Sequence, residues 1–209
     1  MNIIVFGGSG ATGQEIVRLA LTQGFSVTAF VRDPGKLKYH DPKLRVVHGD
    51  VKDYTTVERA MQGNDAVLSA LGVSKPLKRD PIVVEGVRNI IRAMEGSSVR
   101  RLIYLSVLAV REGRARSGFL IRNVISRIVH NEIADHEEKE KLIASSRLEW
   151  TIVRPPKLTN GPRRGNYRFG EDVEPASILP MISRADVADF MLRLLKETAF
   201  VHKAPGIMY

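Results

Sequence analysis

The chain alternates short apolar runs with helical segments, and this alternation limits the possible fold more than any other feature. Apolar runs typical of strands lie at Asn2–Phe6, Ser26–Val31, Leu44–His48, Asp65–Ala70, Arg101–Ser106 and Glu149–Val153. Helical patterns lie between most of them, at Ala11–Gln23, Tyr54–Gln62, about Asp80–Met94 and about Glu132–Ser145. Parallel strands are joined by crossover helices. The sequence therefore predicts an α/β fold, a doubly wound parallel sheet with helices on both faces.

The first expected strand runs directly into a glycine-rich turn, "GGSGATG" at residues 7–13. Gly7, Gly10 and Gly13 fit G-x-x-G-x-x-G, and Gly8, Gly10 and Gly13 also fit G-x-G-x-x-G. Between a strand and a helix this pattern indicates a Rossmann fold that binds a dinucleotide. Glycine lets the backbone turn sharply and approach a pyrophosphate, which then lies at the positive end of the helix. A purely structural turn is the alternative, and the absence of Gly-Lys-Ser/Thr excludes a P-loop.

Two long connections, 107–131 and 155–183, follow the fifth and sixth expected strands. In an open parallel sheet, ligands bind outside the carboxyl ends of the strands. We therefore expect a single NAD(P)-binding domain over residues 1–209, with these two segments on the substrate side. At the end of the second segment, Ser183 and Asp186 have the spacing of a capping box that starts a last helix.

The end of the second expected strand bears on the choice between NAD and NADP. A carboxylate there accepts hydrogen bonds from the ribose 2′-hydroxyl of NAD, whereas an arginine accommodates the 2′-phosphate of NADP. The sequence reads "VRDP", with Arg32 before Asp33. A planar guanidinium suits a phosphate. We therefore expect NADP(H) to be preferred over NAD(H), with Asp33 as the argument for the opposite preference.

The net charge of +9 is concentrated in two segments. Val107–His130 carries a net +4 and Arg154–Arg168 a net +5, which favours anionic ligands there. The first segment also has an apolar helical stripe, typical of a lid or of a docking surface for a partner or a membrane, formed by Leu120, Ile121, Val124, Ile125, Ile128 and Val129. A nucleic-acid arm is a further alternative, but Phe119 alone interleaves the arginines, so nucleic acid is disfavoured.

Composition excludes several classes of site. The chain has no cysteine, so disulfides, thiolate metal sites and cysteine nucleophiles are ruled out. His130 and His136 are six residues apart and do not share a helical face, so no metal site is expected. No secretory signal and no apolar stretch of about 18 residues is present, and we expect a soluble, cytoplasmic protein without a transmembrane segment.

Four stretches in this order, "GGSGATG", "VRDP", "HGDVKD" and "LEWTIVRPP", carry a family resemblance. The chain resembles the atypical short-chain dehydrogenase/reductases, and within them the NmrA-like and biliverdin reductase B (flavin reductase) group of NAD(P)H-binding proteins. The likeness is closest in Asp135–Pro156 and Arg184–Leu195 and weakest in Val107–Asn131. Its motifs are specific for the cofactor fold and only suggestive for the reaction.

The resemblance implies roles for individual residues along the cofactor. It places the pyrophosphate on Gly7, Gly10, Ala11, Thr12 and Gly13, and the 2′-phosphate on Arg32. Asp50 and Val51 would border the adenine, and Ala70, Leu71 and Gly72 would follow the cofactor further. At the nicotinamide, the implied residues are Ser106 and His136, with Pro155 and Pro156 on the other side of the pocket.

Two features depart from that family. Most short-chain dehydrogenases use a Tyr-x-x-x-Lys pair, in which the lysine lowers the pKa of the tyrosine. The spacing occurs here only at Tyr39–Lys43, where Pro42 breaks any helix, and we interpret it as coincidental. Lys157 stands where biliverdin reductase B has a histidine, which leaves the substrate and any acid role at this position open.

These observations suggest a reductase with three candidate catalytic residues, Ser106, His136 and Lys157. Ser106 could orient a carbonyl or the nicotinamide amide, or simply cap the end of its strand. His136 is either catalytic or a buried core histidine. Without a Tyr-Lys pair, a conjugated acceptor such as a flavin or linear tetrapyrrole can delocalise the arriving charge and take its proton from water. We therefore expect NADPH-dependent reduction of a planar, anionic acceptor, and the alternative is an NmrA-like protein that senses NADP(H) without turnover.

Overall fold

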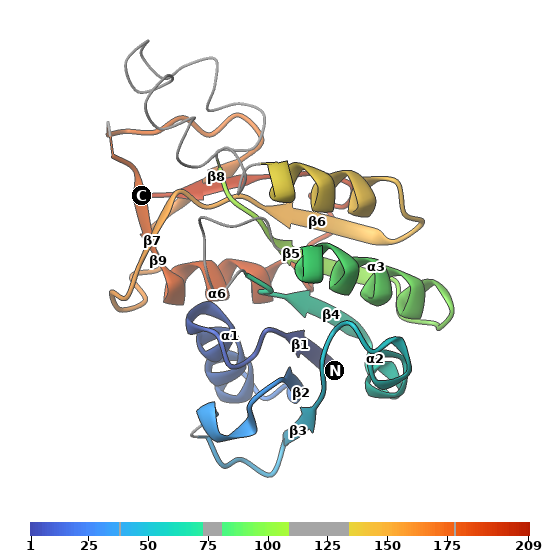
Figure 1. Cartoon of the computed structure of the whole chain (residues 1–209). Coiled ribbons are helices and arrows are strands. Elements are labelled where there is room, and N and C mark those ends of the chain that lie inside the picture. Colours follow the sequence, from blue (N-terminus) through green and yellow to red (C-terminus); the bar gives the residue numbers. More distant parts are fainter. Residues whose placement is uncertain (38, 73–80, 109–133, 178) are drawn as a thin grey trace.

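A computed structural model describes residues 1–37, 39–72, 81–108, 134–177 and 179–209. Its central sheet has six parallel strands (Figure 1), namely β1 (Asn2–Phe6), β2 (Ser26–Val31), β3 (Leu44–His48), β4 (Ala66–Ser69), β5 (Arg101–Leu105) and β6 (Glu149–Val153). The strand order is β3-β2-β1-β4-β5-β6. The doubly wound parallel sheet predicted from the sequence is confirmed, with strand bounds within one residue of those expected.

The order of the strands reverses next to β1, and this reversal positions the ligand site. The chain first moves outward from β1 through β2 to β3, then crosses back to β4 on the other side of β1. The chain therefore diverges after β1 and β4, because the helices that follow them, α1 (Ala11–Thr22) and α3 (Pro81–Glu95), pack on opposite faces of the sheet. Such a divergence opens a crevice at the carboxyl edge, where ligands bind in folds of this type.

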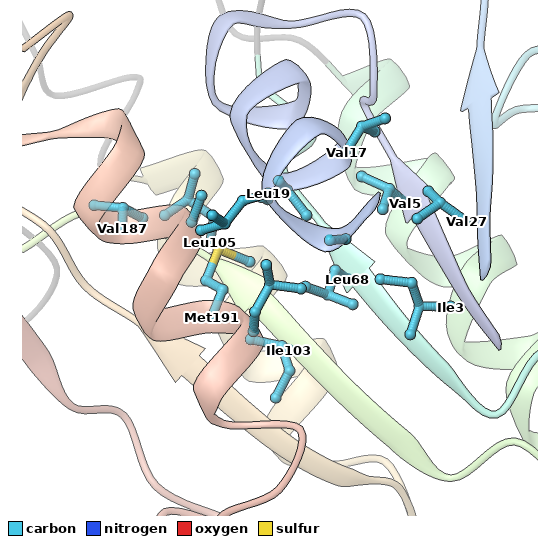
Figure 2. Packing of buried hydrophobic residues seen from close by; sticks show 14 of the residues in the cluster. Ile3, Val5, Val17, Leu19, Val27, Leu68, Ile103, Leu105, Val187 and Met191 are labelled. Atoms are coloured by element: carbon cyan, nitrogen blue, oxygen red, sulfur yellow. The ribbon is translucent and has the colours of Figure 1, made fainter. Parts of the chain in front are cut away.

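Helices cover both faces of the sheet (Figure 1). One face carries α1 (Ala11–Thr22) and α6 (Arg184–Arg193), and the other carries α2 (Tyr54–Met61), α3 (Pro81–Glu95) and a helix over residues 134–144, gold in the figure. Alternate residues of β1 pack against the two helix layers, because successive side chains of a strand point to opposite faces of the sheet. Ile3 and Val5 pack with α1 and α6, as Figure 2 shows, whereas Ile4 and Phe6 join the opposite cluster.

Four further strands of three residues each lie in the last third of the chain. β7 (Lys157–Thr159) pairs in parallel with β9 (Met181–Ser183), and β8 (Arg168–Gly170) pairs antiparallel with β10 (Gly206–Met208). None of these four strands was expected from the sequence, in which 155–183 was interpreted as one long connection. These two strand pairs organise the segment that leads into α6.

Ser183 starts α6 as expected, but the capping box closes differently. The backbone N–H of Asp186 donates to Ser183 Oγ at 3.0 Å. The Asp186 carboxylate does not return to the Ser183 backbone. It accepts hydrogen bonds from the Arg164 and Gly165 backbone and from the Tyr209 hydroxyl at 2.6 Å. Asp186 thus joins the 160–165 connection, the start of α6 and the end of β10.

Several predictions fall outside the described residues. They are the first turn of the third helix at Asp80, the basic and apolar stripe within 109–131, and the helix start near Glu132. The structure of the neighbouring described part agrees with the helices expected there, since α3 begins at Pro81 and residues 134–144 are helical.

Candidate functional site

The glycine turn is shaped by contacts that leave no room for a side chain at two positions. Gly7 has φ +76°, and a Cβ there would lie 2.7 Å from the Ala70 carbonyl oxygen on the neighbouring strand end. A Cβ on Gly13 would lie 2.0 Å from the Gly7 carbonyl oxygen. The turn therefore brings α1 and the end of β4 closer to the β1–α1 connection than any other residue type would allow.

The start of α1 is built to receive an anion. Gly10 is its N-cap and makes no side-chain capping hydrogen bond, and the first turn has no acidic residue. The first backbone N–H groups of a helix have no partner within the helix and sit at its positive end. Gly10, Ala11 and Thr12 line a cavity at this point, so the position fits a phosphate group.

One cavity of about 550 Å³ runs along the carboxyl edge of the sheet. Its wall includes most of the residues implied by the family resemblance, namely Gly7, Gly10, Ala11, Thr12, Arg32, Asp50, Val51, Ala70, Leu71, Gly72, Ser106 and His136. The cavity therefore connects the glycine turn with the residues after β2, β3, β4 and β5. An elongated ligand could contact all of these strand ends at once.

Two cations line the cavity after β2. Arg32 follows the strand directly, and Lys36 lies in the short 3₁₀ helix η1 (Pro34–Lys36). Asp33 is the N-cap of η1, and its carboxylate accepts a hydrogen bond from the Gly35 backbone at 3.1 Å. It also pairs with Lys36 at 3.5 Å. Asp33 is not one of the described residues that line the cavity, because η1 takes up its carboxylate.

The other end of the cavity is lined by Leu105, Ser106, Val107, His136, Leu158 and Arg184. Ser106 donates a hydrogen bond from Oγ to the Glu140 carboxylate at 2.6 Å, and Ser106 Oγ lies 3.4 Å from His136 Nδ1. Arg154 binds the same carboxylate through Nε at 3.2 Å and Nη2 at 2.7 Å. The helix over 134–144 and the end of β6 thus place a buried ion pair directly behind Ser106.

His136 is a neutral side chain at physiological pH. Burial, and then the charge of Lys139, lower the pKa of His136 from the ordinary 6.5 to about 3. A histidine with such a low pKa holds no transferable proton near pH 7. The sequence left His136 as either a catalytic residue or a buried core histidine. His136 is buried and lines the cavity, and its low pKa argues against a role as general acid.

The low pKa of His136 predicts a pH dependence of stability. The unfolded chain binds a proton near pH 6.5 and the folded chain only near pH 3, so the unfolded state binds more protons between these values. His136 should therefore not reduce the free energy of unfolding well above pH 6.5. As the pH is lowered from 7 to 5, this residue should reduce the free energy of unfolding by about 2 kcal/mol. Urea titrations of wild type and His136→Gln at both pH values measure this, and the variant should lose most of that difference.

His40 offers a matched control for this experiment. It is exposed, so His40→Gln removes one histidine without disturbing the packing around Ser106. A wild-type slope unchanged by His136→Gln would show that His136 does not titrate with a lowered pKa in the folded protein.

Four of the residues singled out for the cofactor or for catalysis do not line the cavity, namely Gly13, Pro155, Pro156 and Lys157. Gly13 packs against the Gly7 backbone instead. Pro155 is buried, and its carbonyl oxygen accepts a hydrogen bond from the Leu108 backbone at 2.8 Å. Lys157 begins β7 with an exposed side chain. The catalytic role of Lys157 stays a prediction without support from this geometry.

Three arginines of the second basic segment, Arg154–Arg168, contact other groups of the protein, although the charge of this segment favoured an anionic ligand. Arg154 pairs with Glu140, Arg163 pairs with Asp189 at 2.9 Å, and Arg164 stacks on the Tyr209 ring at 4.6 Å. None of the three lines the cavity. The arginine that does line it at this end is Arg184, which had no expected role from its sequence position. Its Nη1 donates to Asn160 Oδ1 at 2.6 Å, which holds the guanidinium at the cavity wall.

The remaining sequence features lie away from the cavity. Tyr39 packs against the core cluster and Lys43 donates to the Gly24 carbonyl, and neither lines the cavity. Within the described ranges, no group of three His, Asp or Glu side chains could hold a metal ion. A search of the same residues also finds no helix with the length and apolar character required to cross a bilayer.

Comparison with known proteins identifies the family. The sequence profile of the NAD(P)H-binding family matches residues 7–198, and the chain belongs to that family. An uncharacterized chloroplastic protein of Arabidopsis thaliana is 31% identical over 180 residues, which are 78% of this chain and 61% of that protein. The photosystem II assembly factor Ycf39 of Synechocystis is 26% identical, over 97% of this chain and 61% of that one.

A third relative is the (4-alkanoyl-5-oxo-2,5-dihydrofuran-3-yl)methyl phosphate reductase of Streptomyces griseus, 29% identical over 73% of this chain and 46% of that enzyme. The chain thus spans about three-fifths or less of the length of these relatives. Among solved structures, the oxidoreductase ylbE of Lactococcus lactis superposes with a TM-score of 0.83 at 19% identity, covering 99% of this chain and 90% of that one. ChuY of Escherichia coli O157:H7 superposes with a TM-score of 0.78 at 19% identity, covering 99% of this chain and 96% of that one. These two likenesses establish the Rossmann-type fold.

Proposed function

We propose that this protein is an NADPH-dependent reductase that delivers a hydride to a planar, anionic acceptor of the flavin or linear tetrapyrrole type. The observation that carries the proposal is the single cavity that joins an uncapped helix start, two cations after β2 and the Ser106–His136 end. The residues fit the cofactor in order: α1 for the pyrophosphate, Arg32 and Lys36 for a 2′-phosphate, and the ends of β4 and β5 for the nicotinamide side. When bound, NADPH supplies the hydride.

The preference for NADPH rests on the end of β2. Arg32 and Lys36 both line the cavity, whereas the Asp33 carboxylate is bound by the Gly35 backbone and Lys36. A ribose 2′-hydroxyl would need a carboxylate as its partner, and a 2′-phosphate would need cations. The contacts of Asp33 therefore support NADP(H) over NAD(H).

The nature of the acceptor follows from what the chain can supply at the other end. Neutral His136 and a Ser106 hydroxyl already bonded to Glu140 provide no acidic proton. Such a site suits an acceptor whose conjugated system spreads the charge and which takes its proton from water. Arg184 at the cavity wall can bind a carboxylate or phosphate on that acceptor.

The comparisons support both this proposal and its alternative. The relative from Streptomyces griseus is named a (4-alkanoyl-5-oxo-2,5-dihydrofuran-3-yl)methyl phosphate reductase, and the fold neighbour ChuY is described as an anaerobillin reductase. Ycf39, by contrast, is named an assembly factor. A protein that binds NADP(H) to sense or assemble, without turnover, is therefore the second candidate function.

The test compares cofactor binding and turnover in wild type and Arg32→Ala. Loss of charge-assisted hydrogen bonds to a phosphate should raise the Kd for NADPH by about 10- to 100-fold and change the Kd for NADH less than about threefold. Fluorescence titration gives both constants. Oxidation of NADPH with FMN and with biliverdin, followed by absorbance, should be saturable in the acceptor and slower with NADH.

Asp33→Asn is the matched control, because asparagine keeps the cap of η1. It should leave both dissociation constants nearly unchanged, whereas weaker NADH binding in this variant would indicate a ribose contact. Wild-type NADH binding as tight as NADPH binding would contradict the cofactor preference. Tight NADPH binding without oxidation by any acceptor would contradict the reductase and favour the sensing role.

A further inference from the structure

The side chains of Ser106, Glu140 and Arg154 form a buried row behind the cavity wall. Their residues are 3%, 5% and 8% exposed. Ser106 lines the cavity, whereas Glu140 and Arg154 do not. Among the described residues, Glu140 reaches the cavity through Ser106, and Arg154 through Glu140.

The hydrogen bonds in this row decide whether the Ser106 hydroxyl donates or accepts a hydrogen bond on the cavity side. A serine hydroxyl has one proton to donate and lone pairs to accept with, a carboxylate only accepts, and a guanidinium only donates. The Ser106 proton is used at 2.6 Å on Glu140 Oε1, which Arg154 holds in place from its other side. Toward the cavity, Ser106 thus offers only lone pairs.

His136 is consistent with this assignment. It is neutral, so one ring nitrogen carries the proton. Because the Ser106 proton points to Glu140, the 3.4 Å contact between Ser106 Oγ and His136 Nδ1 requires the proton on Nδ1. Nε2 is then an acceptor as well. Ser106 and His136 therefore favour a ligand group with N–H donors, whereas Arg184 at the same end of the cavity is itself a donor.

We propose that Glu140, held by Arg154, is a positioning residue that makes Ser106 a hydrogen-bond acceptor for the carboxamide NH₂ of the nicotinamide. This inference rests on the proposed function, which places the nicotinamide at the ends of β4 and β5. The carboxamide is the one N–H donor on that ring. Its capture by Ser106 would fix the rotation of the amide and, with it, the face of the ring presented to the acceptor.

Glu140→Gln should reverse the polarity of Ser106. Glutamine has one oxygen and one NH₂ where glutamate has two oxygens, and Arg154 requires an acceptor. The shorter Arg154 bond, 2.7 Å to Oε2, holds the amide oxygen more strongly than the 3.2 Å bond to Oε1. The NH₂ group then faces Ser106, which accepts from it and turns its own proton toward the cavity.

The test is the ratio of two equilibrium dissociation constants, for NADP⁺ and for its 3-acetylpyridine analogue, in which a methyl group replaces the NH₂. Wild type should bind NADP⁺ about tenfold more tightly than the analogue, which corresponds to one hydrogen bond. In Glu140→Gln the preference should fall to about one or reverse. In Ser106→Ala it should also be near one. A general structural defect would weaken both ligands alike and leave the ratio unchanged.

Glu138→Gln is the matched control, because Glu138 lies on the same helix and makes an exposed ion pair with Arg88 at 3.3 Å. It should keep the wild-type ratio. If Glu140→Gln does not fold, Glu140→Asp, which retracts the carboxylate by one methylene, should lower the ratio partially. A wild-type ratio near one, or a ratio that Glu140 variants leave unchanged, would overturn the proposal. Because the readout is binding, a lack of turnover contradicts only the proposed reductase.

Discussion

Gly13→Ala is expected to destabilise the protein by about 3 kcal/mol or more, or to prevent folding. The added Cβ would lie 2.0 Å from the Gly7 carbonyl oxygen, 2.8 Å from its carbon and 2.9 Å from the Gly8 Cα. All three are backbone atoms of the turn, so no side-chain rotation relieves the overlap. Either α1 moves away from β1 or the turn is rebuilt, and both lose packing in the cluster that α1 shares with α6 (Figure 2). Urea denaturation of both proteins gives the difference.

Gly96→Ala is the control for the substitution itself. Its Cβ would lie 3.4 Å from the nearest atom, at ordinary contact distance, so stability should stay within about 0.5 kcal/mol of the wild type. If Gly13→Ala were as stable as Gly96→Ala, the turn would be more adaptable than its contacts imply. A folded Gly13→Ala protein should also bind NADPH more weakly, because the cavity wall at Gly7 and Gly10 would shift.

The central sheet was predictable because its signals are local. β1, β4 and β5 are buried on both faces, which gives nearly continuous apolar sequence. The glycine turn was predictable for the same reason, since spacing within seven residues specified it. Most of the residues assigned to the cofactor by resemblance also line the cavity at the carboxyl edge of the sheet.

The short strands of the last third were not predictable from local pattern. β7 pairs with a strand 24 positions later, and β8 with one 38 positions later. Three residues carry too little alternation to be recognised, and β propensity depends mainly on the partner strand. These strands decide where Arg184 and Leu158 lie, so this part of the cavity wall was missed with them.

The roles of the charged residues were the part of the site least predictable from the sequence. Arg154 was counted with the cations that attract an anionic ligand, yet it binds Glu140 inside the protein. Both residues were visible in the sequence, and Glu140 lies one helical turn after His136. The pairing became evident only when the helix over 134–144 was placed beside β6. Likewise, Arg32 and Asp33 are adjacent in the sequence, and only the structure shows which of them lines the cavity. Arg32 lines it, whereas Asp33 caps η1.

The second large effect is expected for Arg154→Met, which leaves the Glu140 charge buried without its partner. Breaking a buried ion pair from one side costs about 3–5 kcal/mol, because the remaining charge keeps its desolvation penalty. Urea denaturation should show this loss. Arg88→Met removes an exposed pair with Glu138 and should cost less than about 1 kcal/mol. Equal losses in the two variants would mean that water reaches Glu140 in the folded protein.

The double variant Arg154→Met/Glu140→Met separates stability from the orientation of Ser106. Replacing both members of a buried pair with apolar side chains of similar size is often neutral, because neither charge remains to be desolvated. Most of the stability lost in Arg154→Met should therefore return. The Ser106 proton would then have lost its carboxylate acceptor, so the preference for NADP⁺ over the acetylpyridine analogue should stay low. Recovery of both properties together would show that the ion pair only supports the fold, and recovery of stability alone would assign it to the cofactor site.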